Sequence, residues 1–134
     1  MTRNELSQIF YLGNELKLWR EELQTLEHRM EQCGRWPSGM PRSGGVSDPT
    51  GELASELANC KLMLGCKEVE IQIQRNRVIK FINEINNSYM RQIIYLRCVL
   101  CMEWENIATR MGGGANSVNL RQAFNRYIKE SGEQ

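Results

Sequence analysis

The side chains best suited to molecular recognition lie near the C-terminal end of the chain, between residues 117 and 130. This segment repeats apolar residues at positions i, i+3, i+4, i+7 and i+8, which is the pattern of an amphipathic helix. We expect one side of that helix to be buried as an apolar stripe, which comprises Leu120, Ala123, Phe124, Tyr127 and Ile128.

The opposite side of the same helix carries amide, basic and small apolar groups. The residues predicted to point away from the core are Val118, Gln122, Asn125 and Lys129, flanked by Asn119, Arg121 and Arg126. Asparagine and glutamine can recognise adenine through two hydrogen bonds in the major groove, and an apolar group can touch a thymine methyl. Arginine and lysine more often hold phosphates. This face therefore predicts binding to double-stranded DNA.

Such a face needs a preceding helix and a tight turn to position it. The segment Glu103–Met111 would supply that helix, with Trp104, Ile107 and Met111 facing inward. Ala108 is the small residue at which two helices can cross, and Gly112 follows it by four positions. Together with Gly113 and Gly114, Gly112 provides the positive φ angles of a turn. The pattern fits a helix-turn-helix, although three ordinary short helices in a bundle would show the same spacing.

Two long heptad helices are expected upstream. Residues 1–32 form the first, which opens with the capping-box spacing of Thr2 and Glu5. Its apolar positions follow at alternating spacings of three and four: Ile9, Leu12, Leu16, Trp19, Leu23, Leu26 and Met30. A stripe of this kind must pack against another helix, in this chain or in a second copy.

The second heptad helix spans residues 51–87 and begins after Asp48-Pro49, an N-cap followed by a favourable first position. Leu57, Leu64, Ile71, Val78 and Ile85 recur every seven residues, with companions Leu53, Cys60, Lys67, Gln74 and Phe81. The polar members Lys67 and Gln74 are of the kind that fixes register or partner. We expect the two helices to form an antiparallel hairpin.

The remaining segments connect these helices. Residues 33–50 are a Pro/Gly/Ser-rich linker, in which Trp36, Met40 and Arg42 could form a binding peptide, or Trp36 could pack onto the hairpin. Asn86-Asn87-Ser88 is typical of a helix start, and a third helix is expected over Ser88–Leu100. Its apolar face is predicted to contain Tyr89, Ile93, Leu96 and Leu100. Residues 131–134 form a tail.

Composition and charge bound the class of protein. The 134 residues are 41% hydrophobic and 25% charged, with no apolar run of the length needed to cross a bilayer. We therefore expect no membrane partner and a cytoplasmic location. The net charge of +1 is unevenly spread, because residues 1–32 carry −2 whereas residues 91–130 carry +3. The basic end is where nucleic acid is expected.

Other chemistry has little support in the sequence. The five cysteines, an odd number, are best read as reduced thiols. Cys98-x-x-Cys101 has the spacing of half a zinc site or a redox pair, but no second pair of suitable spacing accompanies it. There is no phosphate-binding loop and no nucleophile with a nearby base. We expect no catalytic residues, no metal, no cofactor and no enzymatic activity.

The same segments also resemble known families. Met102-Glu103-Trp104-Glu105-Asn106-Ile107-Ala108 is similar to the segment that opens the helix-turn-helix of sigma-factor region-four domains. The glycine turn after Met111, with Asn125-Arg126-Tyr127-Ile128-Lys129, resembles small phage and prophage proteins of Firmicutes, as does the linker from Pro41 to Thr50. The resemblance covers about residues 40–130. It implies a sigma-like transcription regulator of the late-gene activator type.

These observations predict an all-α chain: a long coiled-coil-like helical hairpin followed by a sigma-like helix-turn-helix domain over residues 88–130. The expected function is sequence-specific DNA binding that regulates transcription of phage or prophage genes, as a homodimer or higher homo-oligomer. Host RNA polymerase is a further candidate partner, on which an adaptor could dock through the same surface. The alternative is a structural or DNA-packaging protein like a terminase small subunit, although those commonly place the DNA-binding unit first.

Overall fold

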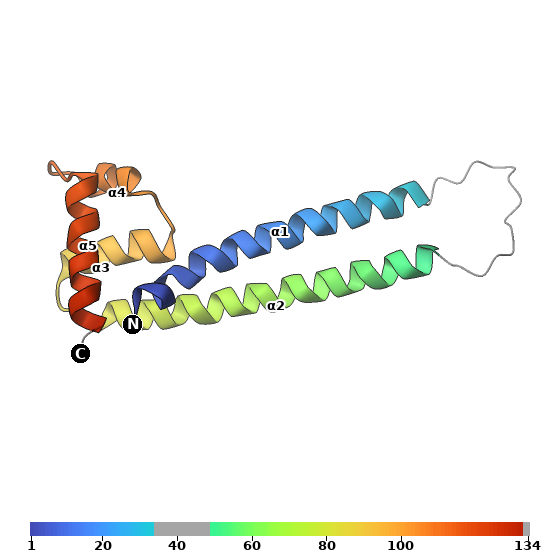
Figure 1. The fold of residues 1–134 in the computed structure, drawn as a ribbon, viewed down its shortest axis with the longest axis horizontal. Coiled ribbons are helices and arrows are strands. Elements are labelled where there is room, and N and C mark those ends of the chain that lie inside the picture. Colours follow the sequence, from blue (N-terminus) through green and yellow to red (C-terminus); the bar gives the residue numbers. More distant parts are fainter. Residues whose placement is uncertain (34–48, 133–134) are drawn as a thin grey trace, which may run out of the picture. The chain divides into compact units, whose positions relative to one another are not determined.

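Every regular element that the structure describes is helical, as the sequence predicts. The structure is a computed structural model, and it describes residues 1–33 and 49–132. The elements are α1 (Arg3–Cys33), α2 (Pro49–Asn83), α3 (Ser88–Ile94), η1 (Tyr95–Val99), α4 (Trp104–Met111) and α5 (Ser117–Gly132) (Figure 1). The element η1 is a single stretch of π-helix. Asp48 and the predicted linker peptide, with Trp36, Met40 and Arg42, lie outside the described residues.

The chain divides into two compact units. Unit 1 comprises Met1–Gly13 and Glu70–Gln134, and unit 2 comprises Asn14–Val69. The predicted helix-turn-helix domain, residues 88–130, is therefore part of a larger compact unit that also contains the first turns of α1 and the last turns of α2.

Unit 2 is an antiparallel pair of helical segments held by its apolar stripe. In α1 the stripe residues Leu16 and Leu26 are buried, and in α2 so are Cys60 and Leu64. The Cys60 thiol donates to the carbonyl oxygen of Trp19 at 3.5 Å. Removal of such side chains from water is worth about 1.5–3 kcal/mol each, which makes this stripe the main source of pairing energy.

A polar position of the α2 stripe is satisfied by an ion pair. The ammonium of Lys67 lies 3.0 Å from the Glu15 carboxylate, and 19% of the Lys67 side chain is exposed. Arg20 and Glu68 form a second, more exposed pair at 3.6 Å. Exposed pairs contribute little to stability. The half-buried Lys67 pair is better placed to fix which residues face each other along the stripe.

Unit 1 is built around one contiguous hydrophobic core. Every helix of the unit contributes to it, and its fully buried side chains are Leu6, Val78, Ile93, Ile94, Ile107 and Leu120. The start of α1 is fixed by the predicted capping box. Thr2 N donates to Glu5 Oε2 at 2.7 Å, and Glu5 N donates to Thr2 Oγ1 at 3.3 Å. The hydrogen bonds that Thr2 N and Thr2 Oγ1 donate to Glu5 Oε2 lower the pKa of the Glu5 carboxyl, because they favour its ionised form.

The third predicted helix differs from expectation in its second half. Asn87 caps α3 as predicted, accepting a hydrogen bond from Tyr89 N at 3.0 Å. After Ile94, however, the chain widens into η1, in which Leu100 N donates to Tyr95 O, five residues back. The predicted face is thus only half right: Ile93 and Leu96 are buried, whereas Tyr89 and Leu100 are exposed. The π turn rotates the register, so Cys98 and Val99 enter the core instead.

Candidate functional site

A glycine turn joins α4 to α5. Gly112 has φ 66° and ψ −163°, a backbone conformation that is essentially restricted to glycine, and its N–H donates to Ala108 O to end α4. Gly113 and Gly114 also have positive φ angles, of 64° and 76°. Three successive glycines of this kind let the chain reverse within the few residues between the two helices.

The start of α5 is fixed by a side-chain cap. Asn116 accepts a hydrogen bond from Val118 N on its side-chain oxygen at 2.9 Å, and its carbonyl accepts from Leu120 N at 3.0 Å. The helix therefore begins at Ser117. With this start, Val118 points outward and 57% of it is exposed.

The predicted inner faces of α4 and α5 pack as expected. Leu120, Phe124 and Ile128 are buried, and Ala123 and Tyr127 are half-buried against the same core. From α4, Ile107 is fully buried and Trp104 meets Phe124 edge-on, with ring centroids 5.3 Å apart. Ala108 and Met111 also pack against this core. The aromatic side of α5 is thus hidden, which leaves its amide and basic side outside.

The outer face of α5 differs from prediction at one position. Most of the predicted residues are exposed, namely Val118, Asn119, Arg121, Gln122, Arg126 and Lys129. Asn125, which was expected to point away from the core, is half-buried. It lines a recess to which the first turns of α1 also contribute. The sequence of α5 alone does not indicate that residues of α1 lie near this position.

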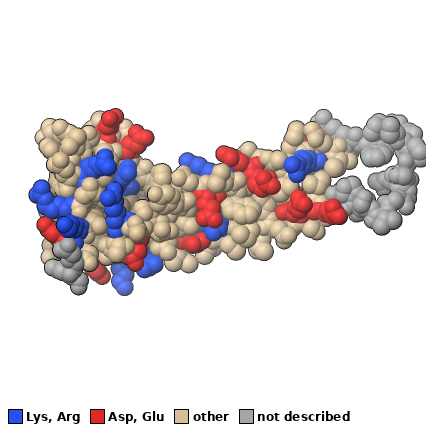
Figure 2. All heavy atoms as spheres, in the orientation of Figure 1, with Lys and Arg blue, Asp and Glu red and all other residues tan. Residues whose placement is uncertain are grey.

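The outer face of α5 is basic and free of carboxylates over the first thirteen residues of the helix. The first acidic residue of the helix is Glu130. Among the residues that the structure describes, Arg121, Arg126 and Lys129 form no ion pair with a carboxylate. Unit 1 as a whole carries ten Lys or Arg residues against seven Asp or Glu, whereas unit 2 carries seven against nine. Figure 2 shows the basic side chains gathered over unit 1 on the face in view.

Arg97 holds the loop before α4 and was not singled out from the sequence. Its Nη1 donates to Met102 O at 2.8 Å, and its guanidinium lies over the Trp104 ring at 5.0 Å from the centroid. The loop needs such support, because Cys101 adopts a positive φ of 54° that a non-glycine residue rarely takes. The sequence feature that could have indicated this role is an arginine within the otherwise apolar run from Ile93 to Val99.

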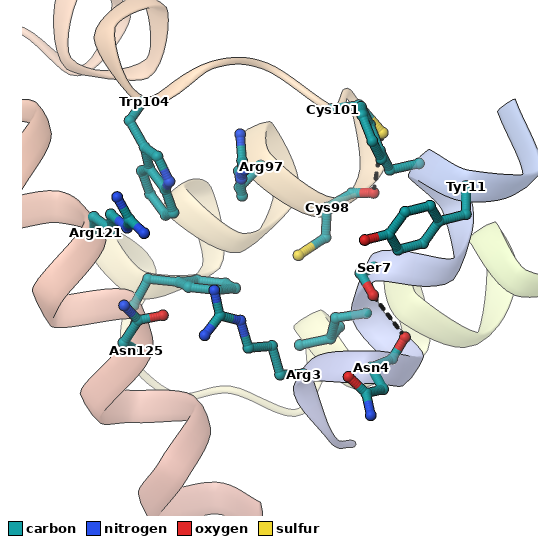
Figure 3. Close-up of a pocket in the computed structure, with 13 residues that line it drawn as sticks. Arg3, Asn4, Ser7, Tyr11, Arg97, Cys98, Cys101, Trp104, Arg121 and Asn125 are labelled. Carbon is teal, nitrogen blue, oxygen red and sulfur yellow. Dashed lines mark hydrogen bonds between the residues drawn. The ribbon is translucent and has the colours of Figure 1, made fainter. Parts of the chain in front are cut away.

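A recess of about 270 Å³ opens beside this loop, within unit 1. Its walls come from the first turns of α1, from η1 and the loop after it, and from α4 and α5 (Figure 3). Three arginines line it, Arg3, Arg97 and Arg121, together with aromatic rings and the amides of Asn4 and Asn125. Sequence reasoning missed this site because its residues lie up to 122 positions apart.

The cysteine pair at residues 98 and 101 is not activated. Burial raises the pKa of the Cys98 thiol to about 12, and burial also raises that of Cys101. Both therefore stay protonated at neutral pH, so neither is a nucleophile there. Within the described residues, no three His, Cys, Asp or Glu side chains are grouped so that they could hold a metal ion.

Comparisons with known proteins yield no relatives. No protein-family model, curated protein or solved structure matches this chain. In the described part of the chain, no helix has both the length and the apolar character needed to cross a lipid bilayer.

Proposed function

We propose that this protein binds double-stranded DNA through the outer face of α5 and regulates transcription of phage or prophage genes. The observation that carries the proposal is the division of α5 into two sides. Leu120, Phe124 and Ile128 anchor one side in the core, while the other presents amides and cations to solvent. A helix held in this way by a preceding helix and a turn is suited to entering the major groove.

The exposed side chains fall into two roles. Val118, Asn119 and Gln122 lie in the first two turns of α5, where a recognition helix meets base edges. Arg121, Arg126 and Lys129 are proposed to contact phosphates, which gives affinity without base preference. The half-buried Asn125 is a weaker candidate for base contact than Gln122, which is exposed.

The assignment to phage transcription rests on the resemblance of residues 40–130 to sigma-like phage and prophage regulators. A homodimer would place two copies of α5 on two half-sites.

Unit 2 offers a surface for such pairing. On α2, Leu62, Cys66 and Val69 follow at spacings of four and three, and all are exposed. That spacing is the seam of a coiled coil, and it is distinct from the stripe that packs on α1. Host RNA polymerase is a second proposed partner, as for a transcription regulator of the activator type.

Binding to a mixed library of duplex DNA over a range of salt concentrations tests this function. With three cations of each subunit on phosphates, the logarithm of affinity should fall against that of salt concentration with a slope of about −3 per bound subunit. Arg126→Ala should weaken binding to all sequences alike and reduce that slope by about one. Gln122→Ala should instead change the preference at one base step, at a cost of about 1–3 kcal/mol for the preferred site. Absence of duplex binding at low salt, or equal effects of the two variants, would contradict the proposal.

A further inference from the structure

The recess beside η1 combines positive charge with aromatic surface. Arg3 comes from the first turn of α1, Arg97 from η1 and Arg121 from α5, so three separate elements bring guanidinium groups to one hollow. No Asp or Glu is among the described residues that line it, and none of the three arginines is ion-paired with a described carboxylate. Like charges gathered without counter-charge repel one another, and a bound anion would relieve that repulsion.

Two of the three arginines are placed by the fold in ways that favour an anion. The Nη1 bond to Met102 O and the stack on Trp104 fix the Arg97 guanidinium, whose other N–H groups stay available. Arg3 lies at the N-terminal end of a 31-residue helix, where the helix dipole is also positive. The neighbouring thiols of Cys98 and Cys101 have raised pKa values, so they add no negative charge at neutral pH.

The remaining walls fit a planar organic group. Trp104 and Phe124 form an edge-to-face pair on one side, and Phe10 and Tyr11 form another, with ring centroids 5.5 Å apart. Phe10 and Tyr11 are 50% and 60% exposed, so their rings are accessible to another molecule. The Asn4 and Asn125 amides provide donors and acceptors for a base edge.

The size of the hollow selects among anions. A volume of about 270 Å³ is several times that of a bare phosphate or sulfate ion and lies near the lower end of the range for small-molecule sites. We propose that this recess binds a mononucleotide, with its phosphate on the three arginines and its base against the aromatic rings. This site goes beyond DNA recognition and does not depend on it.

Occupancy of the recess should also influence the proposed DNA-binding face. Arg121 and Asn125 belong to both, since they line the recess and lie on the side of α5 assigned to DNA. A bound nucleotide would withdraw Arg121 from a DNA phosphate and place a negative charge beside the duplex. This second step rests on the proposed function, whereas nucleotide binding itself does not.

Titration of the full-length protein with adenosine 5′-monophosphate and guanosine 5′-monophosphate tests the proposal. Calorimetry should show saturable binding with a dissociation constant below about 1 mM, and so should tryptophan fluorescence, to which Trp104 contributes together with Trp19 and Trp36. Adenosine, which lacks the phosphate, and inorganic phosphate, which lacks the base, should each bind at least about tenfold more weakly.

Arginine variants locate the site. Arg3→Gln and Arg121→Gln should each weaken nucleotide binding by about tenfold, the cost of one lost charge-assisted contact. Arg110→Gln removes an arginine of α4 that is exposed and lies outside the recess, and should leave nucleotide binding unchanged. Circular dichroism confirms that each variant is folded. Arg3 is exposed, so its replacement is not expected to disturb the core.

Two results would overturn the nucleotide site. One is the absence of saturable binding by either nucleotide up to about 10 mM. The other is equal binding by Arg3→Gln, Arg110→Gln and the unmodified protein. A loss of duplex affinity in Arg3→Gln without nucleotide binding would assign the recess to the DNA backbone instead. A protein that binds nucleotide but no duplex would keep this site and contradict only the proposed function.

Discussion

At the scale of single residues, Arg97 has the clearest structural role outside the buried core. Its fork-shaped guanidinium serves Met102 O and the Trp104 ring at once, which a lysine cannot reproduce. We expect Arg97→Lys to lower the free energy of unfolding by about 1–2 kcal/mol in urea denaturation. Arg110→Lys, on an exposed arginine, should stay within about 0.5 kcal/mol. Equal stabilities of the two variants would contradict this role.

The Cys98 thiol provides a residue-scale prediction with a pH dependence. Its pKa is raised by burial to about 12 in the folded chain, against an ordinary value of 9.0. Between these values the unfolded chain releases a proton that the folded chain keeps, so stability is lost as the pH rises above about 9.

Urea unfolding at pH 8 and pH 10 measures this effect. The stability difference between the unmodified protein and Cys98→Ala should shrink at the higher pH. The same comparison with Cys33→Ala, at an exposed position, should show no such change. A Cys98 thiol that reacts with iodoacetamide in the folded protein at pH 8 as fast as Cys33 would refute its burial.

Two features of α5 show which residue positions could be predicted from the sequence and which could not. The apolar stripe of α5 was predictable because burial of Leu120, Phe124 and Ile128 follows from a local 3.6-residue period. The partial burial of Asn125 was not, because it depends on α1, which lies more than a hundred residues away in the chain. The nucleotide recess was hidden for the same reason.

At the scale of elements, the glycine turn is the part most sensitive to substitution. Gly112→Ala places a side chain at φ 66° and ψ −163°, which should destabilise the protein by about 1–3 kcal/mol. Gly13→Ala is the matched control, because Gly13 lies within α1 with nothing within 4 Å of an added Cβ. It should stabilise by about 0.5–1 kcal/mol. Thermal unfolding distinguishes the two, and shifts of the same sign would contradict the turn geometry.

The helices themselves were largely predictable, and their interruption was not. Repeating apolar spacing located α1, α2, α4 and α5, and Thr2, Asn87 and Gly112 marked ends that the structure confirms. The segment that forms η1 contains no glycine or proline, so no local feature of the sequence predicts the π turn. It arises where the core of unit 1 takes in both Cys98 and Val99.

At the scale of the whole molecule, self-association through α2 is the prediction that separates the regulator from its alternative. Leu62→Glu combined with Val69→Glu should weaken association at least tenfold, about 1.4 kcal/mol, in sedimentation velocity. Leu18→Glu changes an equally exposed leucine of α1 and should have no effect. A dimer is expected of the unmodified protein. A ring of many subunits would favour the packaging alternative, and a monomer at high concentration would contradict the pairing.

The central claim is that the outer face of α5 contacts the duplex, and amide NMR spectra of the full chain test it most directly. Addition of a DNA duplex selected from the library should shift the signals of Val118, Gln122 and Arg126, together with the neighbouring turn. Signals from residues 14–69 should move little. Spectra unchanged by duplex at low salt, or shifts confined to residues 14–69, would contradict the account.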